Sequence, residues 1–129
     1  MYIEHLAIWV SDLETIKAFY CNYFGATAGP VYLNPVKQFQ SIFLSFDHGP
    51  RIELMKMPGI PESANDPYKQ FSGLVHFAIS VGSVHAVDEM ADRLKADGFE
   101  LLDGPRMTGD GYYECVILDP DNNRVEITV

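Results

Sequence analysis

One sequence pattern occurs twice in this chain, and the repeat limits the folds that the chain can adopt. Residues 5–10 read HLAIWV, and residues 76–81 read HFAISV. Each copy is followed by a helix-like stretch, then by a short segment with Gly-Pro, then by two apolar runs joined by a turn. A chain that repeats its order of elements in this way is expected to build two similar modules.

Helix signals follow both copies of the repeat. The first helix is predicted to begin at Ser11, with Glu14 three residues later completing a capping box, and to end at Gly25. The second is predicted to begin after Ser83 and to end at Gly98. Apolar residues recur at helical spacing in both stretches, so both helices should bury one face.

Each half closes with a predicted hairpin, whose turn (residues 47–50 or 119–123) is rich in Asp, Asn, Gly and Pro. Each half therefore reads β-α-β-β-β, and the predicted fold class is α+β. A length of 129 residues, 47% of them hydrophobic, fits a single domain at 1–129 with a sizeable core. The first module is predicted at 1–57 and the second at 74–129.

The segment that joins the halves, residues 58–73, contains three prolines and several small polar residues, so it is predicted to be a linker. Two interpretations stay open for this segment. It is either a solvated connector or a flap over a site, with Tyr68 and Phe71 facing inward.

The acidic composition excludes some classes of partner. A formal charge of −9 argues against nucleic acid and anionic membrane surfaces, which attract basic patches. No apolar run approaches the roughly 20 residues of a membrane span, and the N-terminus lacks the basic segment of a signal peptide. Cys21 and Cys115 do not make a disulfide framework, so we expect a cytoplasmic protein with two cysteines that serve packing.

Four ionisable side chains stand inside apolar, strand-like runs: His5, Glu53, His76 and Glu126. They form two His and Glu pairs with near-equal spacing, one in each half. An unpaired buried charge costs more than a few apolar contacts return, so a shared divalent metal ion is the interpretation that neutralises both carboxylates. A lone strand His is more often a packing residue, and a lone strand Glu is usually exposed. The duplication is what favours ligands.

Strand periodicity predicts which way these side chains face. Side chains alternate between the two faces of a strand, so each histidine and each glutamate should oppose the apolar set that packs under the helix. If the two helix-free faces curl toward each other, the four side chains converge. Imidazole and carboxylate ligands suit Zn, Ni, Co, Mn or Fe. His48 and His85 lack this context and are predicted to be surface residues, and Arg51 and Arg124 are expected to pair with neighbouring carboxylates.

Three segments together resemble the vicinal oxygen chelate superfamily, which includes glyoxalase I, methylmalonyl-CoA epimerase, extradiol dioxygenases and the fosfomycin and bleomycin resistance proteins. The segments are IEHLAIWVSDLETIKAFYCNYFGA, LVHFAISV and LDPDNNRVEITV, and the resemblance covers nearly the whole chain. It implies two βαβββ modules that form an incomplete barrel around a metal, in a homodimer, with the site within one chain or across two.

The same resemblance implies that His5, Glu53, His76 and Glu126 are the metal ligands. Two glutamates resemble glyoxalase I more than the dioxygenases, which use two His and one Glu. The chain departs from the glyoxalase I pattern at Trp9, where bacterial members carry an arginine that helps bind glutathione.

A second departure is Met57, which stands where the glyoxalase I pattern has an asparagine. These departures put a glutathione substrate in doubt and, with Met55, indicate a more apolar pocket. A polar rim is predicted over residues 106–113, where Arg106 and Tyr113 are candidate substrate-binding residues. Arg106 is suited to a substrate carboxylate or phosphate. A glycine-rich loop without a binding role is an equally good reading of that segment.

The predicted reaction is metal-assisted proton transfer next to a carbonyl of a small chelating substrate, with Glu126 or Glu53 as the base. This describes a glyoxalase I-like lyase or isomerase. Two alternatives stay open. One is another metalloenzyme of the superfamily, such as an epimerase, a dioxygenase or an antibiotic or thiol transferase. The other is a metal-free drug-binding module.

Overall fold

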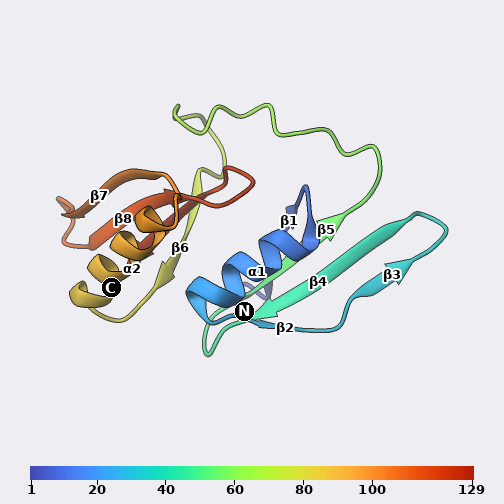
Figure 1. The fold of residues 1–129 in the computed structure, drawn as a ribbon, viewed down its shortest axis with the longest axis horizontal. Helices are drawn as coiled ribbons and strands as arrows, with labels where there is room; N and C mark the ends of the chain where they lie inside the picture. The colour runs from blue at the N-terminus through green and yellow to red at the C-terminus, as the bar shows by residue number, and fades with distance from the viewer. The chain divides into compact units, whose positions relative to one another are not determined.

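Two open sheets, each with one long helix, make up the structure (Figure 1), a computed structural model that describes residues 1–129. The chain divides into two units, Met1–Ser63 and Ala64–Val129. This boundary lies inside segment 58–73, and no helix or strand occurs between the last strand of the first unit and the first strand of the second. The predicted α+β class with two βαβββ modules is confirmed. No helix combines the length and the hydrophobicity that crossing a membrane requires.

The first unit builds its sheet around a central pair of strands. Its elements are β1 (His5–Trp9), α1 (Leu13–Phe24), β2 (Thr27–Ala28), β3 (Tyr32–Asn34), β4 (Phe39–Ser45) and β5 (Arg51–Lys56). Strand β1 runs parallel to β5, and β4 is antiparallel to β5. The single strand expected between the helix and the hairpin is divided into β2 and β3, which both pair with β4. Helix α1 packs against β4 and β5.

The second unit repeats this topology with one continuous strand in place of β2 and β3. Its elements are β6 (His76–Ser80), α2 (Val84–Ala96), β7 (Leu101–Met107), β8 (Tyr113–Leu118) and β9 (Arg124–Thr128). The strand order is β6-β9-β8-β7, with β6 parallel to β9. Helix α2 packs against β7 and β8.

The register of the parallel strands is the same in both units. In each, the histidine lies opposite an arginine, and the glutamate lies opposite an alanine. The partners are His5 and Arg51, Ala7 and Glu53, His76 and Arg124, and Ala78 and Glu126. Because side chains alternate along a strand, this register places the histidine and the glutamate of each unit on one face of its sheet.

The opposite face of each sheet forms the core under the helix. Ile52 and Leu54 flank Glu53 and are buried, as are Val125 and Ile127 around Glu126. Burial of these apolar side chains supplies most of the driving force for docking the helices. The predicted alternation, with apolar residues under the helices and the ionisable residues on the other face, is confirmed.

The helix boundaries agree with the sequence to within one residue. The predicted capping residue of α1, Ser11, is wrong: the N-cap is Asp12, whose carboxylate accepts hydrogen bonds from the Thr15 backbone N–H (2.9 Å) and hydroxyl (3.0 Å). A carboxylate with two donors satisfies this helix end better than a box between Ser11 and Glu14. Ser83 caps α2 as predicted, by accepting from the Ala86 N–H. The C-cap of α1 is the predicted Gly25, and the C-cap of α2 is Asp97, one residue before the predicted Gly98.

Candidate metal-binding site

The first His and Glu pair lies on the helix-free face of the first sheet. His5 on β1 has its Nε2 atom 3.8 Å from a carboxylate oxygen of Glu53 on β5. The other ring nitrogen, Nδ1, is 2.5 Å from the Glu4 carboxylate. That second contact fixes the ring orientation and leaves Nε2 directed toward Glu53, as a carboxylate partner does for metal-binding histidines. The edge of the His5 ring also packs against Phe43.

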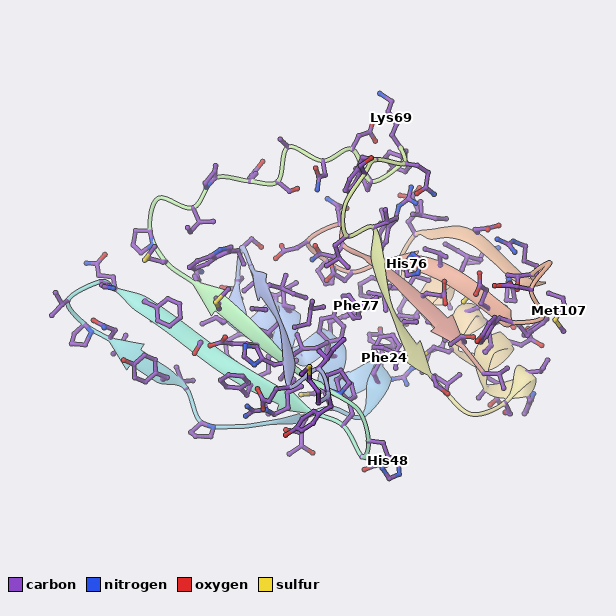
Figure 2. The ribbon with its side chains drawn as sticks, turned by 180° about the vertical axis from the view of Figure 1, so that it is seen from behind. Phe24, His48, Lys69, His76, Phe77 and Met107 are labelled. Carbon is purple, nitrogen blue, oxygen red and sulfur yellow. The ribbon has the colours of Figure 1, made fainter.

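The second pair reproduces this arrangement in the other unit. His76 on β6 has its Nε2 atom 3.3 Å from an oxygen of Glu126 on β9. Figure 2 labels His76 at the start of β6. The imidazole is 43% exposed and the carboxylate 15% exposed, so a solute can reach both donor atoms while the glutamate keeps a restricted position. By itself, neither unit brings together three or more side chains that could hold a metal ion.

A cavity of about 440 Å³ lies beside the second pair, within the second unit. Its wall is mostly polar or charged. The lining residues are Tyr68, Gln70, His76, Leu102, Asp103, Arg106, Glu114, Val116, Arg124 and Glu126. A cavity of this size is in the range of sites for small molecules.

A third acidic residue, Glu114 on β8, lies next to Glu126 in this cavity. The pKa of the Glu114 carboxyl is raised, first by burial, then by the charge of Glu126 and by a side-chain hydrogen bond between the two groups. Two carboxyls this close cannot both ionise without repulsion, so they favour a shared proton or a nearby cation. Glu114 was not among the predicted site residues. It stands in the apolar run YECVIL, so the signal that pointed to Glu53 was present here too.

The prediction that the two strand arginines pair with neighbouring carboxylates is confirmed for Arg51. Arg51 forms an ion pair with Glu4 and stacks over the Phe43 ring, 4.1 Å from its centre. For Arg124 the prediction is wrong. Its Nε atom donates to the backbone carbonyl of Pro67 at 2.7 Å, and it forms no ion pair.

The predicted substrate-binding residues lie in different surroundings. Arg106 lines the cavity and donates through Nε (2.9 Å) and an Nη (2.5 Å) to Asp103, whose carboxyl pKa is lowered by this bond. The Tyr113 hydroxyl donates to Asp88 on α2 at 2.7 Å, which places it on the helix side of the sheet. The Asp88 carboxylate also raises the pKa of the Tyr113 phenol.

Trp9 and Met55 lie next to each other in the first unit, because they are register partners at the ends of β1 and β5. Trp9 is 41% exposed, and its ring meets Phe39 edge to face. By strand alternation both share the face of His5 and Glu53. This face of the first unit is thus apolar beside the donor atoms, in contrast to the charged cavity of the second unit.

The segment before β6 contributes to the cavity wall through Tyr68 and Gln70. Tyr68 donates its hydroxyl to Glu100 at 2.8 Å, while Lys69 extends away from the ribbon (Figure 2). Phe71, the second residue of the flap interpretation, does not line the cavity. Tyr68 borders the cavity but is itself 63% exposed, so neither the solvated connector nor the inward-facing flap describes this segment fully.

Known proteins share both the sequence pattern and the fold. Residues 2–127 match the family model of the Glyoxalase/Bleomycin resistance protein/Dioxygenase superfamily. The chain is 33% identical over 132 residues to the Uncharacterized protein PA2024 of Pseudomonas aeruginosa, a similarity that covers 98% of this chain and 86% of that protein.

Two solved structures show the similarity of fold. The chain superposes on a glyoxylase/bleomycin resistance protein/dioxygenase domain from Frankia sp. EAN1pec with a TM-score of 0.82 and 19% identity, covering 100% of this chain and 97% of that one. It matches the trypanothione-dependent glyoxalase I of Leishmania major with a TM-score of 0.76 and 21% identity, covering 99% and 86%.

Proposed function

Because the chain belongs to the Glyoxalase/Bleomycin resistance protein/Dioxygenase superfamily, we propose that it is a metal-dependent lyase or isomerase of the glyoxalase I kind. Its substrate is a small molecule with two neighbouring oxygen atoms. The observation that carries the proposal is the repeated pair of donor atoms, His5 with Glu53 and His76 with Glu126, in one register on two sheets.

The donor atoms fit a divalent metal ion. Ligands that bind one ion at about 2.1 Å are themselves about 3.0 to 3.4 Å apart. His76 and Glu126, at 3.3 Å, are already in that range, and His5 and Glu53, at 3.8 Å, need only a small side-chain movement. Neither pair alone completes a site, so we propose one ion with four protein ligands, taken from both halves of one chain or of two copies in a homodimer. Two imidazoles and two carboxylates suit Zn, Ni, Co, Mn or Fe.

The bound ion would act as a Lewis acid that polarises the substrate carbonyl. The protein groups around it have separate tasks. Glu4 holds the His5 ring, and Ala7 and Ala78 leave room beside the glutamates, since each lies opposite one of them. A carboxylate, Glu126 or Glu53, removes the proton next to the carbonyl and can return it to the neighbouring carbon. A positioned base of this kind contributes about 10²- to 10⁴-fold in rate.

The walls indicate which substrates the site prefers. Trp9 and Met55 offer an apolar surface on the sheet face that carries His5, and Trp9 stands where bacterial glyoxalase I commonly has an arginine that helps bind glutathione. Arg106 is held by Asp103 but keeps an exposed side at the cavity (47% exposed). We therefore propose a substrate that is smaller and less peptide-like than a glutathione hemithioacetal.

The proposal is tested by proton exchange in metal-loaded protein. Hemithioacetals of methylglyoxal with glutathione and with small thiols are supplied in deuterated water, and deuterium in the product is measured by NMR. We expect turnover with incorporation from solvent, and a loss of at least 100-fold in Glu126→Gln or Glu53→Gln. Full activity in both variants would refute proton transfer by these glutamates. Oxygen consumption with catechols would instead assign the protein to another reaction of the superfamily.

A further inference from the structure

The two halves of the chain carry an arginine at the same register position but surround it differently, and this difference points to a second binding function. Arg51 and Arg124 occupy the same register site, opposite the histidine and two residues before the glutamate. In the first unit the charge of Arg51 is neutralised by Glu4, and its guanidinium lies over Phe43. The internal repeat therefore provides a built-in comparison for Arg124.

Neither of these neighbours exists for Arg124. The residue before His76 is Val75, where the first unit has Glu4. The residue opposite Glu126 on β8 is Val116, where the first unit has Phe43. Arg124 donates one hydrogen bond, from Nε to the Pro67 carbonyl, and makes no ion pair. A guanidinium carries five N–H donors, so this bond leaves its terminal nitrogens available.

The surroundings of Arg124 are those of a binding residue. It lines the cavity of about 440 Å³ together with His76 and Glu126. The charge of Arg106, the other arginine of the cavity, is neutralised by Asp103. Arg124 interacts only weakly with Asp66, because its charge is the smallest of the effects that lower the pKa of the Asp66 carboxyl. The bond to Pro67 fixes the plane of the guanidinium, which reduces the entropy lost when an anion binds.

We propose that Arg124 binds a carboxylate or phosphate group of the substrate, one end of which is held at the metal. This inference rests on the proposed function and extends it to a substrate class: small oxygen chelators that carry an anionic group. Strands β6 and β9 are neighbours, and paired strands lie about 4.8 Å apart, so a two-carbon spacer joins a chelating group near His76 to an anion at Arg124.

Two chelating probes test the proposal by binding rather than by turnover. Acetohydroxamate presents two neighbouring oxygens without a charge on its tail, and succinate monohydroxamate adds a carboxylate on a two-carbon spacer. Their affinities for nickel-loaded protein are measured by calorimetry. We expect the carboxylate compound to bind about tenfold more tightly, as a charge-assisted hydrogen bond provides. Arg124→Met should remove this preference while acetohydroxamate binds as before.

Arg51→Met is the matched control, because its arginine occupies the same register site but is already paired, and it should keep the preference. Equal affinity of the two probes for the unaltered protein would overturn the proposal, as would loss of the preference in Arg106→Met but not in Arg124→Met. A variant that merely loosens the cavity lowers the affinity for both hydroxamates by the same factor, so the ratio of the two affinities stays unchanged.

A metal-free measurement separates this inference from the proposed function. Inorganic phosphate should shift the NMR signals of the Arg124 side chain in metal-free protein, and the shifts should vanish in Arg124→Met. Binding of neither hydroxamate to nickel-loaded protein would refute the metal site. The phosphate result decides independently whether Arg124 is an anion site, and absence of any shift would overturn that assignment.

Discussion

The close approach of β7 to β8, which positions Asp103 and Arg106 in the cavity wall, predicts a steep cost for adding one methyl group at Gly104. An ideal Cβ there would lie 2.5 Å from the Glu114 carbonyl oxygen and 2.9 Å from the Cys115 Cα atom. Both are backbone atoms and cannot turn aside. Gly104 also has a φ of +79°, in the region that side chains disfavour.

These two effects give the expected magnitude. A positive φ costs a non-glycine residue about 1–2 kcal/mol, and overpacking adds about 1–3 kcal/mol. Gly104→Ala should therefore lower the free energy of unfolding by about 2–5 kcal/mol. The measurement is urea denaturation of metal-free protein, followed by circular dichroism.

Two other glycines of the same hairpin separate strain from collision. Gly111 has a φ of +94° but no atom within 4 Å of its Cβ position, so Gly111→Ala should cost only about 1–2 kcal/mol. Gly109 has neither feature, so Gly109→Ala should stay within about 0.5 kcal/mol. If Gly104→Ala costs no more than Gly111→Ala, the described contact between β7 and β8 is wrong, and with it this wall of the cavity.

Three further outcomes follow from single side chains. The raised pKa of Glu114 means that the folded protein binds this proton more tightly than the unfolded chain, so its contribution to stability is lost as pH rises from the ordinary carboxyl pKa through the raised value. Metal-free Glu114→Gln should lack that loss. The free energy of unfolding of both proteins is measured by chemical denaturation from pH 4 to 8, and an equal decrease in the two proteins would contradict this prediction. Ser83→Ala should lower the free energy of unfolding by about 1 kcal/mol, because α2 loses its N-cap. An unchanged free energy of unfolding would show that this cap does not stabilise the protein. Burial raises the pKa of the Cys115 thiol to about 11, so a thiol reagent at pH 8 should modify Cys21 in the native protein and spare Cys115; rapid labelling of both would refute this burial.

The sequence predicted the elements because both halves carry the same periodic signals. Strand alternation and the N-cap of α2 needed only local rules, and those rules held. The cap of α1 was misplaced because Ser11 and Asp12 are both good caps, and only the hydrogen bonds to Thr15 distinguish them. The division into β2 and β3 follows from pairing with β4, which no local pattern encodes.

The sequence predicted that each half places a histidine near a glutamate, but it did not predict what surrounds these two pairs. A His and a Glu in apolar strands, at matching offsets, were enough to predict that His76 and Glu126 lie on the same sheet face. The His76 Nε2 atom is 3.3 Å from an oxygen of Glu126. Tyr113 was predicted at the substrate site, but its hydroxyl donates to Asp88 on the helix side of the sheet. The face that a strand residue occupies depends on the register of the strand, which the sequence did not determine here. The hydrogen bond from Arg124 to the Pro67 carbonyl could not be predicted, because Pro67 lies in a segment without the periodicity of a helix or strand.

Metal binding by matched variants tests the central claim most directly. Nickel or zinc content and affinity are measured by equilibrium dialysis and elemental analysis for the unaltered protein, for His76→Ala and Glu126→Gln, and for His85→Ala. His85 is the control because its Nε2 atom lies 3.2 Å from a Glu89 oxygen, another His and Glu pair, on an exposed helix face. We predict about one ion per chain, a loss of at least tenfold in affinity for the first two variants, and no change in the control. No metal bound by the unaltered protein, or equal losses in all three variants, would contradict the assignment.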